Sequence, residues 1–279
     1  MIRPQSNAHR RATDLSGIWR VAFERTETPC QWQQGIPAAE ALPIAVPGSW
    51  NEQLAETGHM NFMGAGWFEI EVFLPTVAPD RELVLRFGSV DFYAEAWLDG
   101  ERLGQSSAPM LPFELPIPRH LAAGRNARLV VRVEAQLRAD EATQGITQAT
   151  YSQERRPRDE YLPAVRFDFF PYGGINRPVH LVERPVLGLT RWRAGSDLAG
   201  VSLSVETAAG ASVVARLGRG EDAIEVTAAI HEGRAVLRLE PPSPRPWSPD
   251  DPHLYRLEIE LLDANGATID AASQRIGLR

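Results

Sequence analysis

Short segments of alternating apolar and polar residues recur along the chain, with turn-forming residues between them. In the run Gly66–Pro75, for example, Trp67 and Glu69 alternate with Phe68 and Ile70. A two-residue period of this kind is typical of a β-strand with one buried face. A sustained period of 3.6 residues, which amphipathic helices require, is almost absent. The chain is therefore predicted to be all-β.

The predicted strands form two groups. Asp99-Gly100 gives the strongest hairpin signal, because this dipeptide favours the tight turn that joins two neighbouring antiparallel strands. The first group of strands comprises residues 14–24, 44–46, 66–75, 83–87, 93–98, 101–103, 113–117, 128–133 and 179–182. The second comprises residues 187–193, 201–205, 212–214, 224–228, 235–239, 254–262 and 268–278.

A chain of 279 residues is long enough for two domains. We place the boundary at Arg184-Pro185, which predicts a domain over 1–185 and a second over 186–279. The many short strands of the first domain favour a β-sandwich of the jelly-roll type, like galactose-binding domains. The seven strands of the second suit an immunoglobulin-like β-sandwich, without the Cys-Trp-Cys core of antibodies.

Composition excludes several function classes. The net charge of −7 argues against nucleic acid as a partner, because phosphate binding needs a concentrated positive face. No apolar stretch is long enough to cross a bilayer. The single cysteine, Cys30, cannot form an intramolecular disulfide, and residues 1–11 lack the apolar core of a secretory signal. We expect a cytoplasmic protein, or a mature form whose leader has been removed.

An aromatic run at residues 165–181 is the main candidate for a functional surface. Asp168 lies between Phe167 and Phe169, where a carboxylate needs hydrogen-bond donors or a ligand. Gly173-Gly174 permits a positive φ or a close approach of backbone. The alternative is a tight turn in which Asp168 caps its own backbone.

The long polar segment before this run is a second candidate. Residues 138–165 contain no clear strand, and a loop of this length inside a domain often has a function. Tyr161 and its polar neighbours are of the residue types that commonly line sugar sites, because the hydroxyls of a sugar need polar partners and its ring faces pack on aromatic side chains. The alternative is a disordered excursion.

Several motifs resemble those of glycoside hydrolase family 2. Asp168–Arg177 resembles the family signature Asp-Phe-Phe-Asn-Tyr-(Ala/Gly)-Gly-Ile-His-Arg, especially that of its β-glucuronidases. Here Pro171 and Asn176 replace the usual Asn and His, and Phe167 stands where β-glucuronidases often carry His. Five further stretches resemble the family: Asp14–Arg20, Val46–Asn51, Ala96–Gly100, Trp247–Tyr255 and Arg275–Arg279.

The resemblance implies a role in sugar binding. In the family, the aspartate of the signature reaches the sugar bound in a catalytic (β/α)₈ barrel, and Asp168 occupies that position. We expect Asp168, Phe167, Tyr172 and Tyr161 to contact substrate. The segment Trp247–Tyr255 is expected to pack back onto the second domain as a structural staple without a catalytic duty.

The resemblance also implies that catalysis lies elsewhere. A retaining glycosidase needs two carboxylates about 5 Å apart. In the family both glutamates belong to the barrel, and the resemblance stops at Arg279 before that barrel would begin. We therefore expect no catalytic residue in this chain, no activity of the chain alone and no cofactor. The six histidines show no ligand spacing, so no metal is expected.

Two functions are compatible with the sequence. The first is the non-catalytic N-terminal part of a family 2 glycoside hydrolase, β-glucuronidase-like or β-galactosidase-like, which lends a sugar-binding loop to the rim of the active site. Its expected partners are a β-glycoside, a barrel in cis or in trans and further copies of itself. The second is a stand-alone carbohydrate-binding or assembly module that has lost the barrel.

Overall fold

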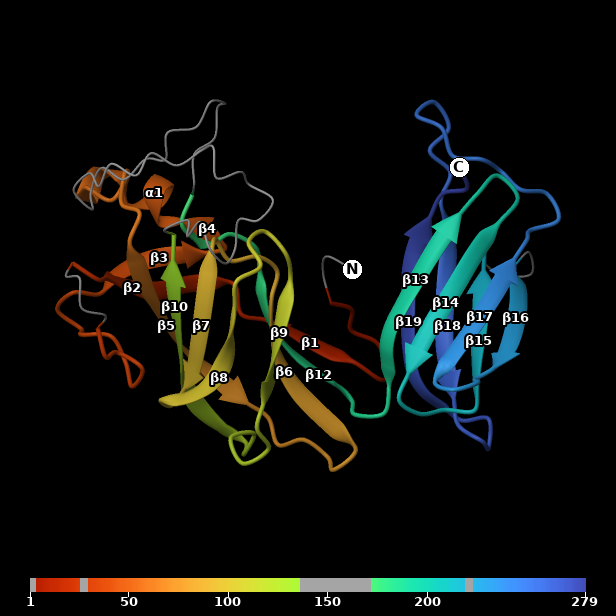
Figure 1. Ribbon diagram of the computed structural model, residues 1–279, viewed down its shortest axis with the longest axis horizontal. Coiled ribbons are helices and arrows are strands. Elements are labelled where there is room, and N and C mark those ends of the chain that lie inside the picture. The colour runs from red at the N-terminus through yellow and green to blue at the C-terminus, as the bar shows by residue number, and fades with distance from the viewer. Residues whose placement is uncertain (1–3, 26–29, 136–171, 219–222) are drawn as a thin grey trace. The chain divides into compact units, whose positions relative to one another are not determined.

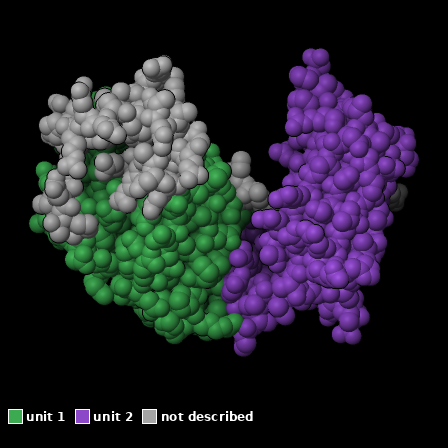
Figure 2. All heavy atoms as spheres, in the orientation of Figure 1, with its two compact units in different colours: residues 1–4, 12–78, 83–182 green, residues 5–11, 79–82, 183–279 purple. Residues whose placement is uncertain are grey.

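The computed structural model describes residues 4–25, 30–135, 172–218 and 223–279. These residues form strands with only two short helical turns, so the all-β prediction is confirmed (Figure 1). Two compact units are present, and Figure 2 colours them separately. Unit 1 comprises 1–4, 12–78 and 83–182, and unit 2 comprises 5–11, 79–82 and 183–279. No helix in these described ranges is long and apolar enough to cross a membrane.

Unit 1 is a sandwich of two antiparallel sheets. One sheet has the strand order β3-β2-β5-β10-β7-β8, and the other has the order β1-β12-β6-β9. The bounds of the first are β3 (Leu42–Val46), β2 (Gly17–Phe23), β5 (Ala65–Leu74), β10 (Arg125–Glu134), β7 (Tyr93–Leu98) and β8 (Glu101–Ser106). Those of the second are β1 (Arg11–Asp14), β12 (Val179–Pro185), β6 (Arg81–Phe87) and β9 (Phe113–Ile117).

The predicted hairpin is present between β7 and β8. Asp99 and Gly100 have φ values of 48° and 83°, and two successive positive values are the mark of a tight hairpin turn. The carboxylate of Asp99 accepts hydrogen bonds from the backbone N–H of Arg128 (2.7 Å) and from the Arg125 guanidinium (2.5 Å). The turn is therefore anchored to β10, the central neighbour of β7.

Both faces of the six-stranded sheet are buried around β5, whereas the alternating pattern predicted only one buried face. Phe68 belongs to the main core between the two sheets, and Trp67 on the opposite face is only 1% exposed. Trp67 stacks on Trp97, with ring centroids 5.2 Å apart, and Trp32 contacts it edge-on. The irregular segment 30–41 thus covers the outer face of the sheet, because apolar side chains in that segment provide a second small core.

A cluster of charges lies beneath the same segment. The guanidinium of Arg132 donates to Glu24 (3.0 and 3.1 Å) and to Glu134 (3.0 Å), and the Trp67 Nε1–H donates to Glu24 (2.7 Å). Burial alone would raise the pKa of Glu24, but the bonds from Arg132 and Trp67 outweigh it and hold that pKa below its usual value. The ion pairs therefore stay charged under the cover of the loop.

Unit 2 is a smaller sandwich with its own core. Its sheets have the orders β13-β14-β17 and β16-β15-β18-β19. The seven strands are β13 (Leu189–Ser196), β14 (Val201–Thr207), β15 (Ser212–Leu217), β16 (Ile224–Ala229), β17 (Arg234–Leu239), β18 (Tyr255–Leu262) and β19 (Thr268–Ile276). These are the seven strands predicted for an immunoglobulin-like domain, and the predicted fold class is confirmed.

The N-terminal segment packs on unit 2 rather than on unit 1. The side-chain amide of Gln5 bonds to both backbone groups of Ser273, and Asn7 donates to the Ala271 carbonyl (2.8 Å). These side-chain amides form hydrogen bonds with backbone groups at the edge of β19, as a neighbouring strand would. This contact was not predicted from the sequence. The division into domains 1–185 and 186–279 stays a prediction.

A buried ion pair fastens the same segment. The guanidinium of Arg10 donates to both carboxylate oxygens of Asp270 (2.8 and 2.6 Å), and it also donates to the Leu189 carbonyl (3.0 Å). Asp270 is fully buried and accepts a further bond from the Leu189 backbone N–H (2.8 Å). The start of β13 and the middle of β19 are therefore joined through Arg10.

Candidate functional site

Most of the predicted sugar-contacting residues lie outside the described part of the chain. This holds for Tyr161, Phe167 and Asp168, whose proposed contacts stay predictions. Tyr172 is the first residue described after that gap, and its side chain is 43% exposed. The described part of the candidate site is therefore its base, which is the end of the aromatic run from Tyr172 to Asn176.

Two motifs more than a hundred residues apart meet at this base. The short strands β4 (Gly48–Ser49) and β11 (Gly174–Ile175) pair with each other (Figure 1). The backbone N–H of Trp50 donates to the Gly173 carbonyl (3.2 Å), and the Gly173 N–H donates to Asn51 Oδ1 (2.8 Å). The Val-Pro-Gly-Ser-Trp-Asn motif thus holds the end of the aromatic run.

The two glycines are required by close packing. A Cβ atom on Gly173 would lie 2.1 Å from Trp50 Cζ2, and one on Gly174 would lie 2.5 Å from the Gly48 carbonyl oxygen. Gly174 also has φ +143°, a conformation that other residues rarely adopt. The prediction that Gly173-Gly174 permits close backbone approach or a positive φ is confirmed.

Trp50 and Asn51 connect this base to the core. They begin the helical turn α1 (Trp50–Gln53), which Ser49 caps through its hydroxyl and which is followed by the 3₁₀ turn η1 (Ala55–Thr57). Trp50 is fully buried, and its Nε1–H donates to the Phe62 carbonyl (3.0 Å). The Asn51 amide donates to the Met60 carbonyl (2.9 Å). The motif is therefore rigid, since its polar groups are bonded inside unit 1.

Asp91 is a buried carboxylate that the sequence reasoning missed. It accepts hydrogen bonds from the Asn176 side-chain amide (2.6 Å) and from the Met110 backbone N–H (3.0 Å), and its own N–H donates to the Gly174 carbonyl (3.1 Å). Burial raises its pKa, although these bonds partly oppose the rise. The sequence did contain a hint of this site, because Asp91 stands between the apolar residues Val90 and Phe92.

Asn176 completes the base of the turn. Its side-chain amide donates to the Tyr172 carbonyl (3.1 Å) as well as to Asp91, and its backbone N–H donates to the Ser89 carbonyl (3.2 Å). Asn176 is the position at which this sequence departs from the usual His of the family signature. The structure explains the replacement, because the two N–H groups of the Asn176 amide can donate to the Asp91 carboxylate and to the Tyr172 carbonyl at the same time.

The arrangement at this base can hold one end of a loop in place. Around the base, Met110, Leu111 and Tyr172 are exposed apolar or aromatic side chains, and Arg177 donates to the Met110 carbonyl (3.4 Å). Within the described residues, no group of three or more His, Cys, Asp or Glu side chains could hold a metal ion. The base therefore fixes the position of the chain at Tyr172.

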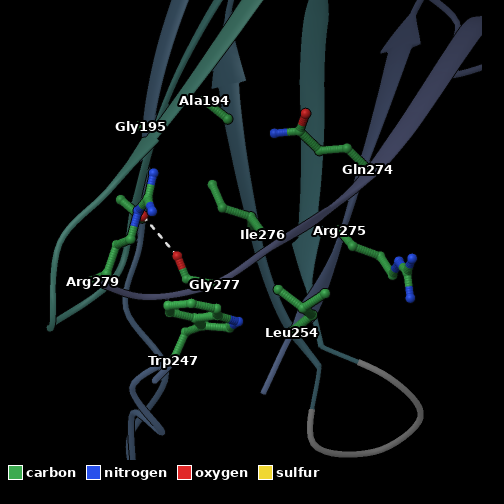
Figure 3. A pocket seen from close by; sticks show the side chains of 10 residues that line it. Ala194, Gly195, Trp247, Leu254, Gln274, Arg275, Ile276, Gly277 and Arg279 are labelled. Carbon is green, nitrogen blue, oxygen red and sulfur yellow. Dashed lines mark hydrogen bonds between the residues drawn. The ribbon is translucent and has the colours of Figure 1, made fainter. Parts of the chain in front are cut away.

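A hollow lies in unit 2, where the predicted staple packs. Trp247, Leu254, Ile276, Gly277 and Arg279 are among the residues that line a cavity of about 430 Å³. Figure 3 shows Trp247 next to Gly277. The Trp247 N–H donates to the Leu278 carbonyl (2.8 Å), and a Cβ on Gly277 would lie 2.7 Å from Trp247 Cβ. The proline-rich segment thus packs onto the end of the second sandwich as predicted.

Comparison with known proteins assigns the family. Residues 12–185 match the family model described as glycosyl hydrolases family 2, sugar binding domain, and residues 195–279 match the model described as glycosyl hydrolases family 2. The first match alone spans more than half of the chain. The chain therefore belongs to glycosyl hydrolase family 2, and the resemblance inferred from its motifs is confirmed.

The chain is similar to several β-glucuronidases, both curated relatives and solved structures. The chain is 28% identical over 286 residues to the β-glucuronidase of Paenibacillus borealis and 26% identical over 308 residues to that of Felis catus, with all of this chain covered. It spans about half of these relatives, 47% and 46% of their lengths. The crystal structure of Ruminococcus gnavus β-glucuronidase has the same fold, with a TM-score of 0.81 and 22% identity, over 99% of this chain and 46% of that one.

Proposed function

We propose that this chain is the non-catalytic N-terminal part of a β-glucuronidase-like family 2 glycoside hydrolase. It contributes the aromatic run that contains Asp168 to the rim of a sugar site, whose two catalytic carboxylates belong to a barrel in cis or in trans. The sugar-binding residues are Asp168, Phe167, Tyr172 and Tyr161. β-Galactosidase-like specificity is the variant of this proposal that the comparisons do not favour.

One observation carries the proposal. The end of the aromatic run is bonded on two sides, to Trp50 and Asn51 through Gly173 and to Asp91 through Asn176. A binding loop must be held in place if its side chains are to meet a sugar at a fixed position, because misplacement by about 1 Å can cost a hundredfold in rate. These hydrogen bonds, together with the exposed side chain of Tyr172, support the proposal that the turn positions a sugar-binding loop.

A chimera tests the proposal. Residues 1–279 would replace the matching 47% of the Paenibacillus borealis relative, and turnover of an aryl β-glucuronide would be measured. We expect the chimera to be active and Asp168→Ala to lower kcat/KM by about 10²-fold, as expected when a positioning contact to substrate is lost. Val236→Ala is the matched control, since Val236 is 75% exposed in unit 2.

Two outcomes would contradict the proposal. An unchanged kcat/KM in the Asp168→Ala variant of an active chimera would remove the signature loop from the sugar site. Alternatively, the unmodified chain could bind uronides or β-galactosides at micromolar concentration in a manner that Asp168→Ala abolishes. That result would favour the stand-alone carbohydrate-binding module instead.

A further inference from the structure

In unit 2 the edge strands β13 and β19, which belong to different sheets, border the cavity that Figure 3 shows. The chain is bonded across this border near both ends of β13. The Leu189 backbone N–H donates to the Asp270 carboxylate (2.8 Å), and the Ser196 hydroxyl donates to the Gly277 carbonyl (2.8 Å). Between these contacts an added Cβ on Gly195 would meet nothing within 4 Å. The sandwich is therefore open between its two edge strands at this point.

Arg275 leaves two backbone groups unpaired at this edge of β19. Asn7 donates to the Ala271 carbonyl (2.8 Å), and the Gln5 amide bonds to both backbone groups of Ser273. In an antiparallel strand the backbone groups of every second residue point to the same edge, so those of Arg275 also point away from β18. Among the residues that the structure describes, no group bonds to the Arg275 N–H or C=O. The row of edge contacts is therefore interrupted beside the cavity.

The side chains around the cavity provide hydrogen-bond donors and apolar surface. Its apolar side chains include Trp247, Leu254 and Ile276, and Leu254 is 41% exposed. Within the described part of the chain, the Arg275 guanidinium, the Gln274 amide and the Trp247 indole N–H have no hydrogen-bond or ion-pair partner. The only charged side chains among the described lining residues are those of arginines. The cavity therefore suits an anionic group next to an apolar one.

The contact between Gln5 and Ser273 shows which group fits such an edge. The Gln5 amide presents one C=O to the Ser273 N–H and one N–H to the Ser273 carbonyl, as a peptide group of a neighbouring strand would. Arg275 follows two residues later, so a peptide group beside it would continue the same row along β19. A carboxylate next to that peptide group would pair with the Arg275 guanidinium in a charge-assisted hydrogen bond.

We infer that the gap beside Arg275 binds an extended acidic segment of a partner protein, which adds a strand to the edge of β19. The backbone of the segment pairs with the N–H and C=O of Arg275, an apolar side chain enters the cavity beside Trp247, and a carboxylate pairs with the guanidinium. In this mode of recognition main-chain bonds give affinity, and pockets for alternate side chains give specificity. The inference is independent of the proposed function, because it involves no sugar and no residue of the signature turn.

Calorimetric titration of the full chain with a synthetic peptide tests the inference. The probe is the acetylated and amidated peptide Glu-Thr-Phe-Thr-Glu, for which we expect saturable binding. Replacing both Glu residues by Lys removes the carboxylates, and N-methylation of the Thr and Phe residues removes the backbone donors. Each of these two control peptides should bind weaker by about 10-fold or more, the factor that corresponds to roughly 1.4 kcal/mol.

A charge reversal in the chain tests the same contact from the other side. Arg275→Glu should weaken binding of the acidic peptide by about 10-fold or more, because a carboxylate then faces the carboxylates of the peptide. Arg275 is exposed, so this variant should fold like the parent. Arg234→Glu is the matched control, since it changes the net charge equally at a side chain of β17 that is 73% exposed. It should leave the affinity unchanged.

Hydrogen exchange of single backbone amides gives a second readout. In the free chain the Ser273 N–H is bonded to Gln5, whereas the Arg275 N–H should exchange faster because it has no partner. The bound peptide should slow exchange at Arg275 and leave Ser273 unchanged. Absence of saturable binding, binding that Arg275→Glu or N-methylation leaves unchanged, or exchange at Arg275 that the peptide does not slow would each overturn the inference.

Discussion

Gly173 is the residue at which close packing and the candidate site coincide. A Cβ there would lie 2.1 Å from Trp50 Cζ2 and 2.6 Å from Ala135 Cβ, and neither neighbour is the end of a flexible chain. We expect Gly173→Ala to lower the free energy of unfolding by about 1–3 kcal/mol, because overpacking forces the core to shift. Urea denaturation measures the loss.

Gly195 provides the matched control. It lies in β13 of unit 2, where an added Cβ would meet nothing within 4 Å. Gly195→Ala should change stability by no more than about 0.5 kcal/mol, as expected for surface substitutions. Equal effects of the two substitutions would mean that the contact between Gly173 and Trp50 does not hold the turn.

Some single residues of the candidate site could be predicted from the sequence, and others could not. Gly173-Gly174 was read correctly because the need for close approach or positive φ is local. Asp91 was not identified, because its role depends on a partner far along the chain, Asn176. Local pattern gives no distance between such positions.

At the scale of elements, the N-terminal segment is fastened to unit 2 by a buried ion pair. Arg10→Ala would leave the fully buried Asp270 without its cation. We expect a loss of about 3–5 kcal/mol in the free energy of unfolding of unit 2, because an uncompensated buried charge is costly. Thermal or urea denaturation of the full chain measures it.

An exposed pair serves as the comparison for this prediction. Arg238 donates to Asp197 (2.8 Å) on the surface of the same unit, where water screens the interaction. Arg238→Ala should therefore cost much less than Arg10→Ala. If the two cost the same, residues 5–11 do not contribute to the stability of unit 2.

The strands themselves were largely predictable, whereas what covers them was not. The two-residue period placed the strands of both sandwiches, and Asp99-Gly100 fixed a hairpin. The cover of β5 by residues 30–41 and the capping of the β19 edge by Gln5 and Asn7 were missed. Neither segment has a periodic pattern, since each is positioned by tertiary contacts alone.

At the scale of the whole molecule, family membership and fold follow from the same motifs. The stretches Val46–Asn51 and Asp168–Arg177 that carried the resemblance are joined in the structure through β4 and β11. Their meeting could be expected from the family but not from the chain's own pattern, because two-residue strands are too short to show a period. The contacts of Asp168 lie outside the described residues.

The central claim is that this chain positions a sugar-binding loop and leaves the bond cleavage to a barrel. The most direct test is turnover of an aryl β-glucuronide by the purified chain alone, with the Paenibacillus borealis relative as the positive control. We predict no hydrolysis above background at any enzyme concentration. Turnover that rises with the concentration of the chain and is lost in Asp168→Ala would contradict the claim.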